Sequence, residues 1–393
     1  MPHIKVKPFD TSLIETKISQ STLLKFRVTA INQGDELWGI VLENKEFLLQ
    51  VKHYDDSVLI KYDKITRPLK VNLLKKALKY VVNELKLEVI SSNISQHKDT
   101  YYASKYEKSI EDFYTASFSF KKVSVEIGFG SGRHLLYQAK KHPNTLFIGL
   151  EIHTPSAQQV LKQIELQDLK NIWIVNYDAR LFLEMLPSNL LEQIFIHFPV
   201  PWDKKPHRRI ISLNFLSESM RVLKKEGRLE LRTDSKNYFW YALEVFFAIP
   251  KTHIEVHKNK VLEVTSKYEA RWLKMEKDIY DIYVVCNEES QAQQALPDFN
   301  FNIVKYGKYL AEGLPKKTLV KEDYFVHIER VYKGNDKMLL VKCSFGSFNR
   351  PEHKYILLTK EECRYVASSP VKSHTNHKAH LKLMELLSNV KCN

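Results

Sequence analysis

A glycine-rich turn that begins with an acidic residue is the first place where this sequence could bind a ligand. The segment Glu126-Ile127-Gly128-Phe129-Gly130-Ser131-Gly132 follows an apolar stretch and precedes a helical pattern. Alternate glycines let the backbone turn sharply and approach a ligand closely, and the new helix offers unpaired N–H groups. Arg133 stands where a dinucleotide site has its third glycine, which argues against NAD or FAD. The leading acid instead favours a ligand that carries positive charge.

Two further carboxylates follow the next two predicted strands. Glu151 ends the second strand, where it could accept hydrogen bonds from both ribose hydroxyls, and Asp178 follows the third, where it could accept one from an adenine amino group. Singly, each acid could equally be a solvated surface carboxylate, or, for Asp178, a helix N-cap. Glu126 favours a positively charged ligand, whereas Glu151 and Asp178 suit a ribose and an adenine. Together the three acids indicate a site for S-adenosylmethionine.

A loop rich in proline, aromatic and basic residues follows the fourth predicted strand. It runs from His197 through Pro199-Val200-Pro201-Trp202-Asp203 to a basic tail of Lys204, Lys205, Arg208 and Arg209. Prolines stiffen the loop, Trp202 offers a face on which a base can stack, and the cations can engage phosphates. The alternative is a basic surface loop with a partly buried tryptophan. Asp234 follows the fifth strand, where it could also be a helix cap.

These residues require a sheet that brings successive strand ends to one edge. From Lys122 onward, apolar strands alternate with helical patterns, which predicts an α/β domain with a mainly parallel sheet of the Rossmann-like kind. The predicted strands are Val123 to Ile127, Leu146 to Ile152, Ile172 to Tyr177, Gln193 to Phe198 and Arg228 to Arg232. The predicted helices are Arg133 to Lys141, Ser156 to Leu166, Ala179 to Leu186 and Leu213 to Leu223.

The two ends of the chain have a different pattern. Short apolar stretches separated by turns between Leu23 and Tyr62 predict antiparallel hairpins, followed by an amphipathic helix near Leu74 to Leu85. Strand-like runs also occur between Phe325 and Leu358, before a short helix near Leu381 to Leu387. We therefore expect a β-rich N-terminal extension over 1–105, the α/β domain over 106–290 and a basic β-rich C-terminal extension over 291–393. Whether the two extensions pack together stays open.

Net charge, cysteine spacing and the lack of a long apolar run limit which partners, metal sites and locations are expected. The chain has 60 Lys and Arg against 46 Asp and Glu, a net charge of +14, which favours a polyanion such as nucleic acid but equally suits simple solubility. Four isolated cysteines lack metal-site spacing, so neither a zinc site nor a disulfide framework is expected. No run of about 18 apolar residues occurs. We expect a cytoplasmic protein without a membrane or an obligate protein partner.

In this order, the motifs resemble the bacterial tRNA (guanine-N(7)-)-methyltransferase family across roughly Val123 to Val285. The resemblance rests on E-I-G-F-G-x-G, I-E-I-H, D-A, F-P-x-P-W-x-K, T-D and S-K-Y-E. It implies a class I S-adenosylmethionine-dependent methyltransferase fold, S-adenosylmethionine as methyl donor without a metal, and nitrogen 7 of a guanosine in the tRNA variable loop as acceptor.

Carried over by position, the resemblance also implies two sets of site residues. The set expected to bind the donor is Glu126, Gly128, Gly130, Glu151 and Asp178. The set expected to contact the substrate is Lys204, Asp234, Ser266, Lys267, Tyr268 and Glu269. One position departs from the family, because Val200 replaces the acid of F-P-D-P-W, to which a catalytic and donor-binding role is usually given. Asp203 or Asp234 could compensate from nearby.

Other activities remain as alternatives. An enzyme that methylates exocyclic amines has a polar residue at the start of a similar Pro-Pro-aromatic loop, and this chain has none there. A carbon 5 pyrimidine methyltransferase needs a cysteine nucleophile in the substrate loop, but no cysteine precedes Cys286. The alternative from another class is an inactive tRNA-binding protein on a methyltransferase scaffold, with Val200 as the sign of lost activity.

Overall fold

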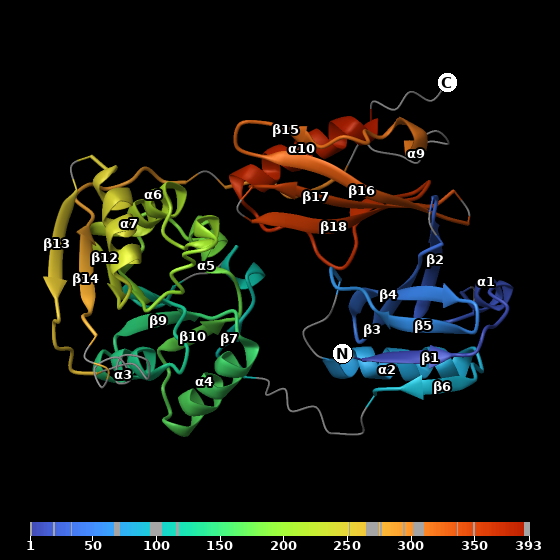
Figure 1. Ribbon diagram of the computed structural model, residues 1–393, viewed down its shortest axis with the longest axis horizontal. Coiled ribbons are helices and arrows are strands. Elements are labelled where there is room, and N and C mark those ends of the chain that lie inside the picture. Colours follow the sequence, from blue (N-terminus) through green and yellow to red (C-terminus); the bar gives the residue numbers. More distant parts are fainter. Residues whose placement is uncertain are drawn as a thin grey trace. The chain divides into compact units, whose positions relative to one another are not determined.

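The computed structural model divides the chain into two compact units. It describes residues 2–18, 20–32, 34–66, 71–94, 104–114, 118–250, 252–264, 275, 277–293, 295–301, 310–335, 337–348 and 350–388. One unit comprises Met1–Thr100 with Leu296–Asn393, and the other comprises Tyr101–Ala295 (Figure 1). We call them the terminal unit and the central unit.

The central unit is built on a sheet of eight strands in the order β13-β14-β12-β11-β8-β9-β10-β7. Neighbours from β7 to β12 run parallel, and β14 is antiparallel to both β12 and β13. The strands are β7 (Glu107–Lys108), β8 (Lys122–Ile127), β9 (Thr145–Leu150), β10 (Ile172–Val175), β11 (Leu191–His197), β12 (Leu223–Thr233), β13 (His253–Lys258) and β14 (Tyr280–Val285). This confirms the predicted class I methyltransferase fold.

Helices connect these strands and cover the sheet. Helices α3 and α4 pack on β9 and β10, whereas α6 and α7 pack on β12 and β14. The helices are η1 (Glu111–Phe113), α3 (Arg133–Lys141), α4 (Thr154–Leu166), α5 (Ala179–Phe182), η2 (Leu183–Met185), η3 (Pro206–Arg208), α6 (Leu213–Val222) and α7 (Lys236–Phe247). The helix predicted over Ala179 to Leu186 is thus an α-helical turn followed by a 3₁₀ turn.

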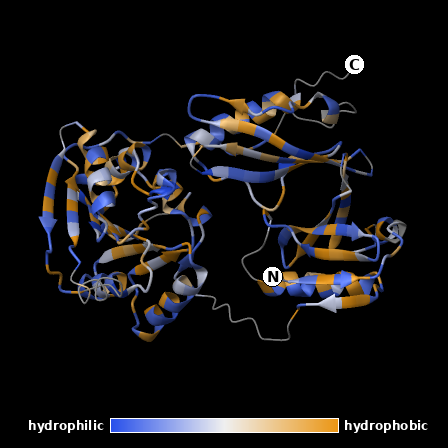
Figure 2. Cartoon of the chain, viewed as in Figure 1, coloured by the Kyte–Doolittle hydropathy of each residue, from blue (hydrophilic) through white to orange (hydrophobic). Residues whose placement is uncertain are grey.

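Burial explains why the central strands are so apolar. All residues of β8 after Lys122 are buried, because parallel strands with helices on both faces have no solvent face. Figure 2 shows β9 as almost entirely hydrophobic, whereas hydrophilic and hydrophobic bands alternate along β13 at the edge of the sheet. The chain passes from β8 to β9 and β10 on one side, and then returns to β11 and β12 on the other. In sheets of this kind, ligands bind at the carboxyl ends of the strands where the order reverses, here those of β8 and β11.

The terminal unit is built on an antiparallel sheet of eleven strands in the order β19-β18-β17-β16-β2-β3-β4-β5-β1-β6, with β15 paired to β16. Its first segment contributes β1 (His3–Val6), α1 (Ser12–Ile18), β2 (Leu24–Ala30), β3 (Glu36–Leu42), β4 (Lys45–Tyr54), β5 (Ser57–Tyr62), α2 (Val71–Glu84) and β6 (Val89–Ser92). Its second contributes α9 (Leu310–Gly313), β15 (Leu319–Val320), β16 (Phe325–Gly334), β17 (Leu339–Gly346), β18 (Pro351–Leu358), β19 (Cys363–Tyr365) and α10 (His374–Ser388).

The structure decides that the two ends of the chain form one sheet. Strand β16 pairs with β2, with Tyr332 opposite Ala30 and Gly334 opposite Val28. A shared core, including Phe26, Leu48 and Leu357, lies across this junction. The central unit is therefore inserted between β6 and α9 of a discontinuous terminal unit.

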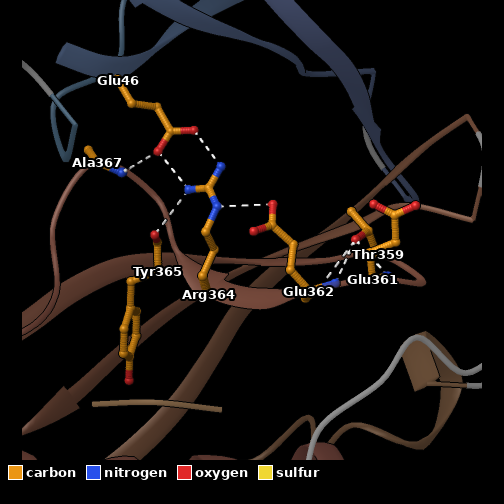
Figure 3. Close-up of polar contacts among 7 residues, drawn as sticks. All are labelled: Glu46, Thr359, Glu361, Glu362, Arg364, Tyr365 and Ala367. Carbon is orange, nitrogen blue, oxygen red and sulfur yellow. Dashed lines mark hydrogen bonds and ion pairs between the residues drawn. The ribbon is translucent and has the colours of Figure 1, made fainter. Parts of the chain in front are cut away.

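Side chains reinforce this junction. Arg364 donates to both oxygens of Glu46, at 2.7 and 2.8 Å, and the Ala367 N–H donates to Glu46 at 3.0 Å (Figure 3). Burial by itself would raise the pKa of Glu46, but these bonds hold it below its usual value. A paired, planar contact of this kind fixes both distance and orientation. The buried Tyr355 hydroxyl likewise donates to Asp63, at 2.9 Å.

No helix in the ranges that the structure describes is long and apolar enough to cross a membrane.

A half-buried carboxyl in η2 makes the stability of the central unit dependent on pH. Burial and the neighbouring Glu218 raise the pKa of Glu184 to about 7, although Arg221 opposes the shift. The pKa of folded Glu184 lies above its unfolded value of 4.5, so the protonated side chain stabilises the folded state. This stabilisation is complete at acid pH and is lost as the pH rises from 4.5 through about 7. We expect Glu184→Gln to raise the free energy of unfolding at pH 8 by about 2 kcal/mol.

Hydrogen exchange of the central unit at pH 4 and pH 8 tests this prediction. At pH 4 the variant and the parent should differ little, since Glu184 is protonated in both the folded and the unfolded chain. The same gain at both pH values would contradict the proposed ionisation.

Candidate functional site

The glycine-rich turn joins β8 to α3 in a conformation that suits glycine. Gly128, Gly130 and Gly132 have φ angles of +70°, +54° and +71°. A Cβ atom on Gly132 would lie 2.5 Å from Val160 Cγ2, so this glycine is packed against α4. A Cβ on Gly128 would meet no atom within 4 Å, and one on Gly130 only the Gly128 oxygen at 4.0 Å. The turn is thus closed on its helix side and open at Gly128 and Gly130.

Two of the predicted donor acids contact this turn. Glu151 accepts hydrogen bonds from the N–H groups of Gly130 and His153, both at 2.9 Å. Glu126 is 3% exposed and accepts a bond from His134 Nδ1 at 2.8 Å. The carboxyl ends of β8 and β9 therefore meet at the turn, as the strand order requires. Each carboxylate can accept more bonds than these.

Asp178 follows β10, the next strand, and it is also a helix N-cap, which was the alternative role allowed by the sequence. It is the N-cap of α5, accepts a bond from the Arg180 N–H at 3.0 Å, and pairs with the Arg180 guanidinium at 2.8 Å. The side chain of Asn176, which the sequence did not single out, donates to the Glu151 carbonyl at 2.5 Å. This bond joins the ends of β9 and β10. Any contact between Asp178 and a ligand would be shared with Arg180.

The loop after β11 is held in an unusual backbone conformation. Phe198 and Trp202 have φ angles of +52° and +47°, which are uncommon for residues other than glycine. The Phe198 N–H donates to the Arg232 carbonyl at 2.7 Å, which ties the loop to the end of β12. Val200 is 60% exposed and Trp202 is 37% exposed. The tryptophan ring, with the Arg208 guanidinium 5.1 Å from its centre, is accessible for stacking.

The basic residues of this loop do not all face solvent. Arg209 donates to the Pro201 carbonyl at 2.8 Å, lies 3.4 Å from Asp203 and stacks 4.3 Å from the centre of the Tyr241 ring. Its side chain is only 10% exposed. Lys204 and Lys205 are exposed. Arg209 thus braces the loop, and the two lysines remain accessible to phosphates.

Asp234 is not the cap that the sequence allowed. Ser235 caps α7 by accepting the Tyr238 N–H at 3.2 Å, whereas Asp234 pairs with Lys277 at 3.2 Å. Ser266, Lys267, Tyr268 and Glu269 lie outside the described residues. Glu263, shortly before them, accepts a bond from the Tyr137 hydroxyl at 2.6 Å, so the chain leading towards them is held on α3.

Sequence reasoning missed a buried polar cluster beneath the strand ends. His197 lies 2.9 Å from Glu230, and its ring centre lies 4.5 Å from that of His134. Burial would raise the pKa of Glu230, but the bond from His197 holds it below its usual value. On the next strand pair, Arg232 forms a buried ion pair with Asp281. The sequence did carry a signal for this cluster. Glu230 and Arg232 are charged residues two positions apart on a strand that is buried on both faces.

Comparison with known proteins places the chain in a family. A family model described as "Putative methyltransferase" matches residues 121–282. A tRNA (guanine-N(7)-)-methyltransferase of Wolinella succinogenes is 43% identical over 91% of this chain and 92% of its own length. One of Helicobacter pylori is 44% identical over 88% and 86%. A solved structure, "Structure of an antibiotic related Methyltransferase", is 23% identical with a TM-score of 0.32 and covers 42% of this chain and 87% of its own.

The Wolinella alignment spans 363 residues, more than Tyr101–Ala295 contains, so the relatives share most of the terminal unit as well. The sequence motifs alone limited the resemblance to the central unit. With relatives this similar over most of both chains, the chain belongs to the tRNA (guanine-N(7)-)-methyltransferase family.

Proposed function

We propose that the chain transfers a methyl group from S-adenosylmethionine to nitrogen 7 of a guanosine in the variable loop of tRNA. The main structural support is the bond between Glu151 and the Gly130 N–H, beside a turn that is open at Gly128 and Gly130. A carboxylate and a close backbone approach thus lie at one strand edge, as an adenosine site needs. The relatives' names give methylation of a tRNA guanine at nitrogen 7, which also supports the acceptor atom.

The residues at this edge fit such a donor. Glu126 would hold the positively charged amino acid part, Glu151 the ribose hydroxyls, and Asp178 the adenine amino group. When bound, S-adenosylmethionine supplies a methyl group that is activated towards nucleophiles by the positive sulfonium. The chain's own contribution is to hold the two substrates in line, and positioning of this kind can supply about 7–11 kcal/mol of a barrier.

Acceptor chemistry explains why Val200 is compatible with activity. Nitrogen 7 of guanine has an in-plane lone pair and no proton, so its attack on a methyl group needs no general base. A nearby carboxylate would mainly stabilise the positive charge that the base gains. The loop after β11 would bind the base on Trp202 and the flanking phosphates on Lys204 and Lys205. Ser266, Lys267, Tyr268 and Glu269 are proposed as further substrate contacts by family resemblance.

Incubation of the purified protein with tRNA and labelled donor, followed by mapping of 7-methylguanosine by chemical cleavage, tests this function. The second candidate, an inactive tRNA-binding protein, is favoured only by the exposed Val200 in place of the family's acid. Both candidates predict tRNA binding that weakens with salt. Labelled tRNA without 7-methylguanosine would point to another target atom, and binding without any label would support the inactive protein.

Asp203 and Asp234 are the candidates for the missing acid. Each is ion-paired, Asp203 with Arg209 at 3.4 Å and Asp234 with Lys277 at 3.2 Å. If one of them stabilises the cationic product, its replacement by alanine should lower the methyl-transfer rate about tenfold, the effect of about 1.4 kcal/mol in the transition state. Single-turnover rates at saturating donor measure this. Unchanged rates in both Asp203→Ala and Asp234→Ala would contradict the compensation.

Lys204 and Lys205 should contribute electrostatic affinity for tRNA. Affinity falls as salt rises, and each phosphate contact contributes roughly 0.7–0.9 to the steepness of log affinity against log salt. The double variant Lys204→Ala/Lys205→Ala should therefore make this dependence less steep by about 1–2. Filter binding over a series of salt concentrations measures it. Lys225→Ala is the matched control, because Lys225 is exposed near the beginning of β12, at the opposite end of that strand from the proposed site. Equal slopes in parent and double variant would contradict the phosphate contacts.

A further inference from the structure

His134 is a buried histidine at the start of α3, and neither the motifs nor the proposed chemistry gives it a role. It is 6% exposed and lies 2.8 Å from the Glu126 carboxylate, the proposed acid for the donor's amino acid part. The two residues lie on either side of the glycine-rich turn, one at the end of β8 and the other in the first turn of α3. Their contact therefore spans the turn from strand to helix.

The contacts of the imidazole with Glu126 and Gln138 favour one of its two tautomers. Nε2 lies 3.0 Å from the Gln138 side-chain nitrogen, an N–H donor, so Nε2 is the acceptor in that bond. Nδ1 then carries the hydrogen, which it donates to Glu126 Oε2. A histidine in this tautomer donates to the carboxylate through Nδ1 and leaves the other carboxylate oxygen available for a ligand. The bond occupies one oxygen of Glu126.

Aromatic neighbours hold the ring in this orientation. The centre of the His134 ring lies 4.9 Å from that of Phe195 and 4.5 Å from that of His197, both on β11. His197 is in turn bound to Glu230 on β12, at 2.9 Å. Side chains from β8, α3, β11 and β12 thus form one packed group. A rotation of the imidazole away from Glu126 would disturb contacts on β11.

We propose that His134 is a positioning residue for the methyl-donor site: its Nδ1–H fixes the Glu126 carboxylate so that the remaining oxygen faces the donor's ammonium group. The inference rests on the proposed function of Glu126. A carboxylate on a side chain with several rotatable bonds loses entropy when a ligand orders it, and a prior hydrogen bond removes part of that cost. His134 acts through Glu126, so its loss should weaken donor binding and leave tRNA binding unchanged.

Three substitutions separate the hydrogen bond from packing. His134→Phe keeps an aromatic ring but has no donor, and should raise the dissociation constant of S-adenosylmethionine about tenfold, the effect expected for a bond to a charged group. His134→Asn places an amide N–H near the position of Nδ1, and should restore affinity to within about threefold of the parent. In a Glu126→Gln background, His134→Phe should weaken binding by less than about twofold, because the two residues act as one unit.

Calorimetry of donor binding to the full-length chain gives these constants, and circular dichroism verifies that each variant is folded. Parent-like donor affinity in His134→Phe would overturn the proposal, as would effects of His134→Phe and Glu126→Gln that simply multiply. In both cases the parent protein would still methylate tRNA. Failure of the proposed function gives a different result, since the parent itself would then show neither donor binding nor 7-methylguanosine.

Discussion

Glu126→Gln is expected to lower kcat/KM for S-adenosylmethionine about 100-fold. The substitution keeps the size of the side chain but removes the charge that would pair with the donor's ammonium group, an interaction worth about 1.5–3 kcal/mol. It also replaces the carboxylate that accepts the Nδ1–H of His134. The glutamine oxygen can still accept the His134 Nδ1–H, but because position 126 is only 3% exposed, water cannot readily replace the lost charge pairing. Most of the loss should lie in donor binding rather than in kcat.

Initial rates at varied donor concentration and saturating tRNA measure this effect. Glu192→Gln is the matched control, because Glu192 belongs to the same sheet but lies near the beginning of β11, where it pairs with Lys224 at 2.7 Å. The control should retain parent activity, and both variants should retain tRNA affinity. A Glu126→Gln enzyme with parent kcat/KM would remove Glu126 from the donor site.

Asp281→Ala is expected to destabilise the central unit by about 3–5 kcal/mol. Asp281 on β14 and Arg232 on β12 are 0% and 1% exposed, respectively, and form an ion pair. Burial raises the pKa of Asp281, and Arg232 counteracts this shift. Removal of the acid leaves a guanidinium in a site with little solvent, which is costly because the lost partner is not replaced by water.

Hydrogen exchange at the amides of β12 and β14 measures this change locally, which matters because a protein of two units need not unfold in one step. Asp278→Ala is the control: its carboxylate pairs with Lys258 at 2.7 Å but is 43% exposed, so solvent screens the pair and its loss should cost little stability. The double variant Arg232→Leu/Asp281→Leu should recover much of the stability, since two apolar side chains leave no buried charge. Equal protection in Asp281→Ala and Asp278→Ala would contradict the buried pair.

The central unit was largely predictable because its signals are local. A buried parallel strand is a short apolar run, a glycine-rich turn is needed where φ is positive, and a class I sheet brings strand ends together in a fixed order. These rules predicted that Glu126, Glu151 and Asp178 would lie at successive strand ends beside the glycine-rich turn. In the structure Glu151 accepts a bond from the Gly130 N–H of that turn, and Glu126 bonds to His134 just beyond it. They also predicted the helices α3, α4 and α6 to within a few residues.

Several features depend on tertiary contacts that sequence spacing does not encode. The sequence allowed four cations to face solvent after β11, but Arg209 turns inward because the Pro201 carbonyl and the Tyr241 ring lie close enough to bind it. It also allowed Asp234 to cap α7, a role that Ser235 takes. Both outcomes depend on which of several suitable partners lies within hydrogen-bonding distance after folding.

The sequence by itself determined the alternation of strands and helices in the central unit, the glycine-rich turn and the acids at the strand ends, because each follows from local patterns. Only the tertiary structure decided that β2 pairs with β16, and that His134 holds Glu126 across the turn. An antiparallel strand can pair with many others of similar pattern, and the choice is made by the core that the pairing buries, here the shared cluster around Phe26 and Leu357.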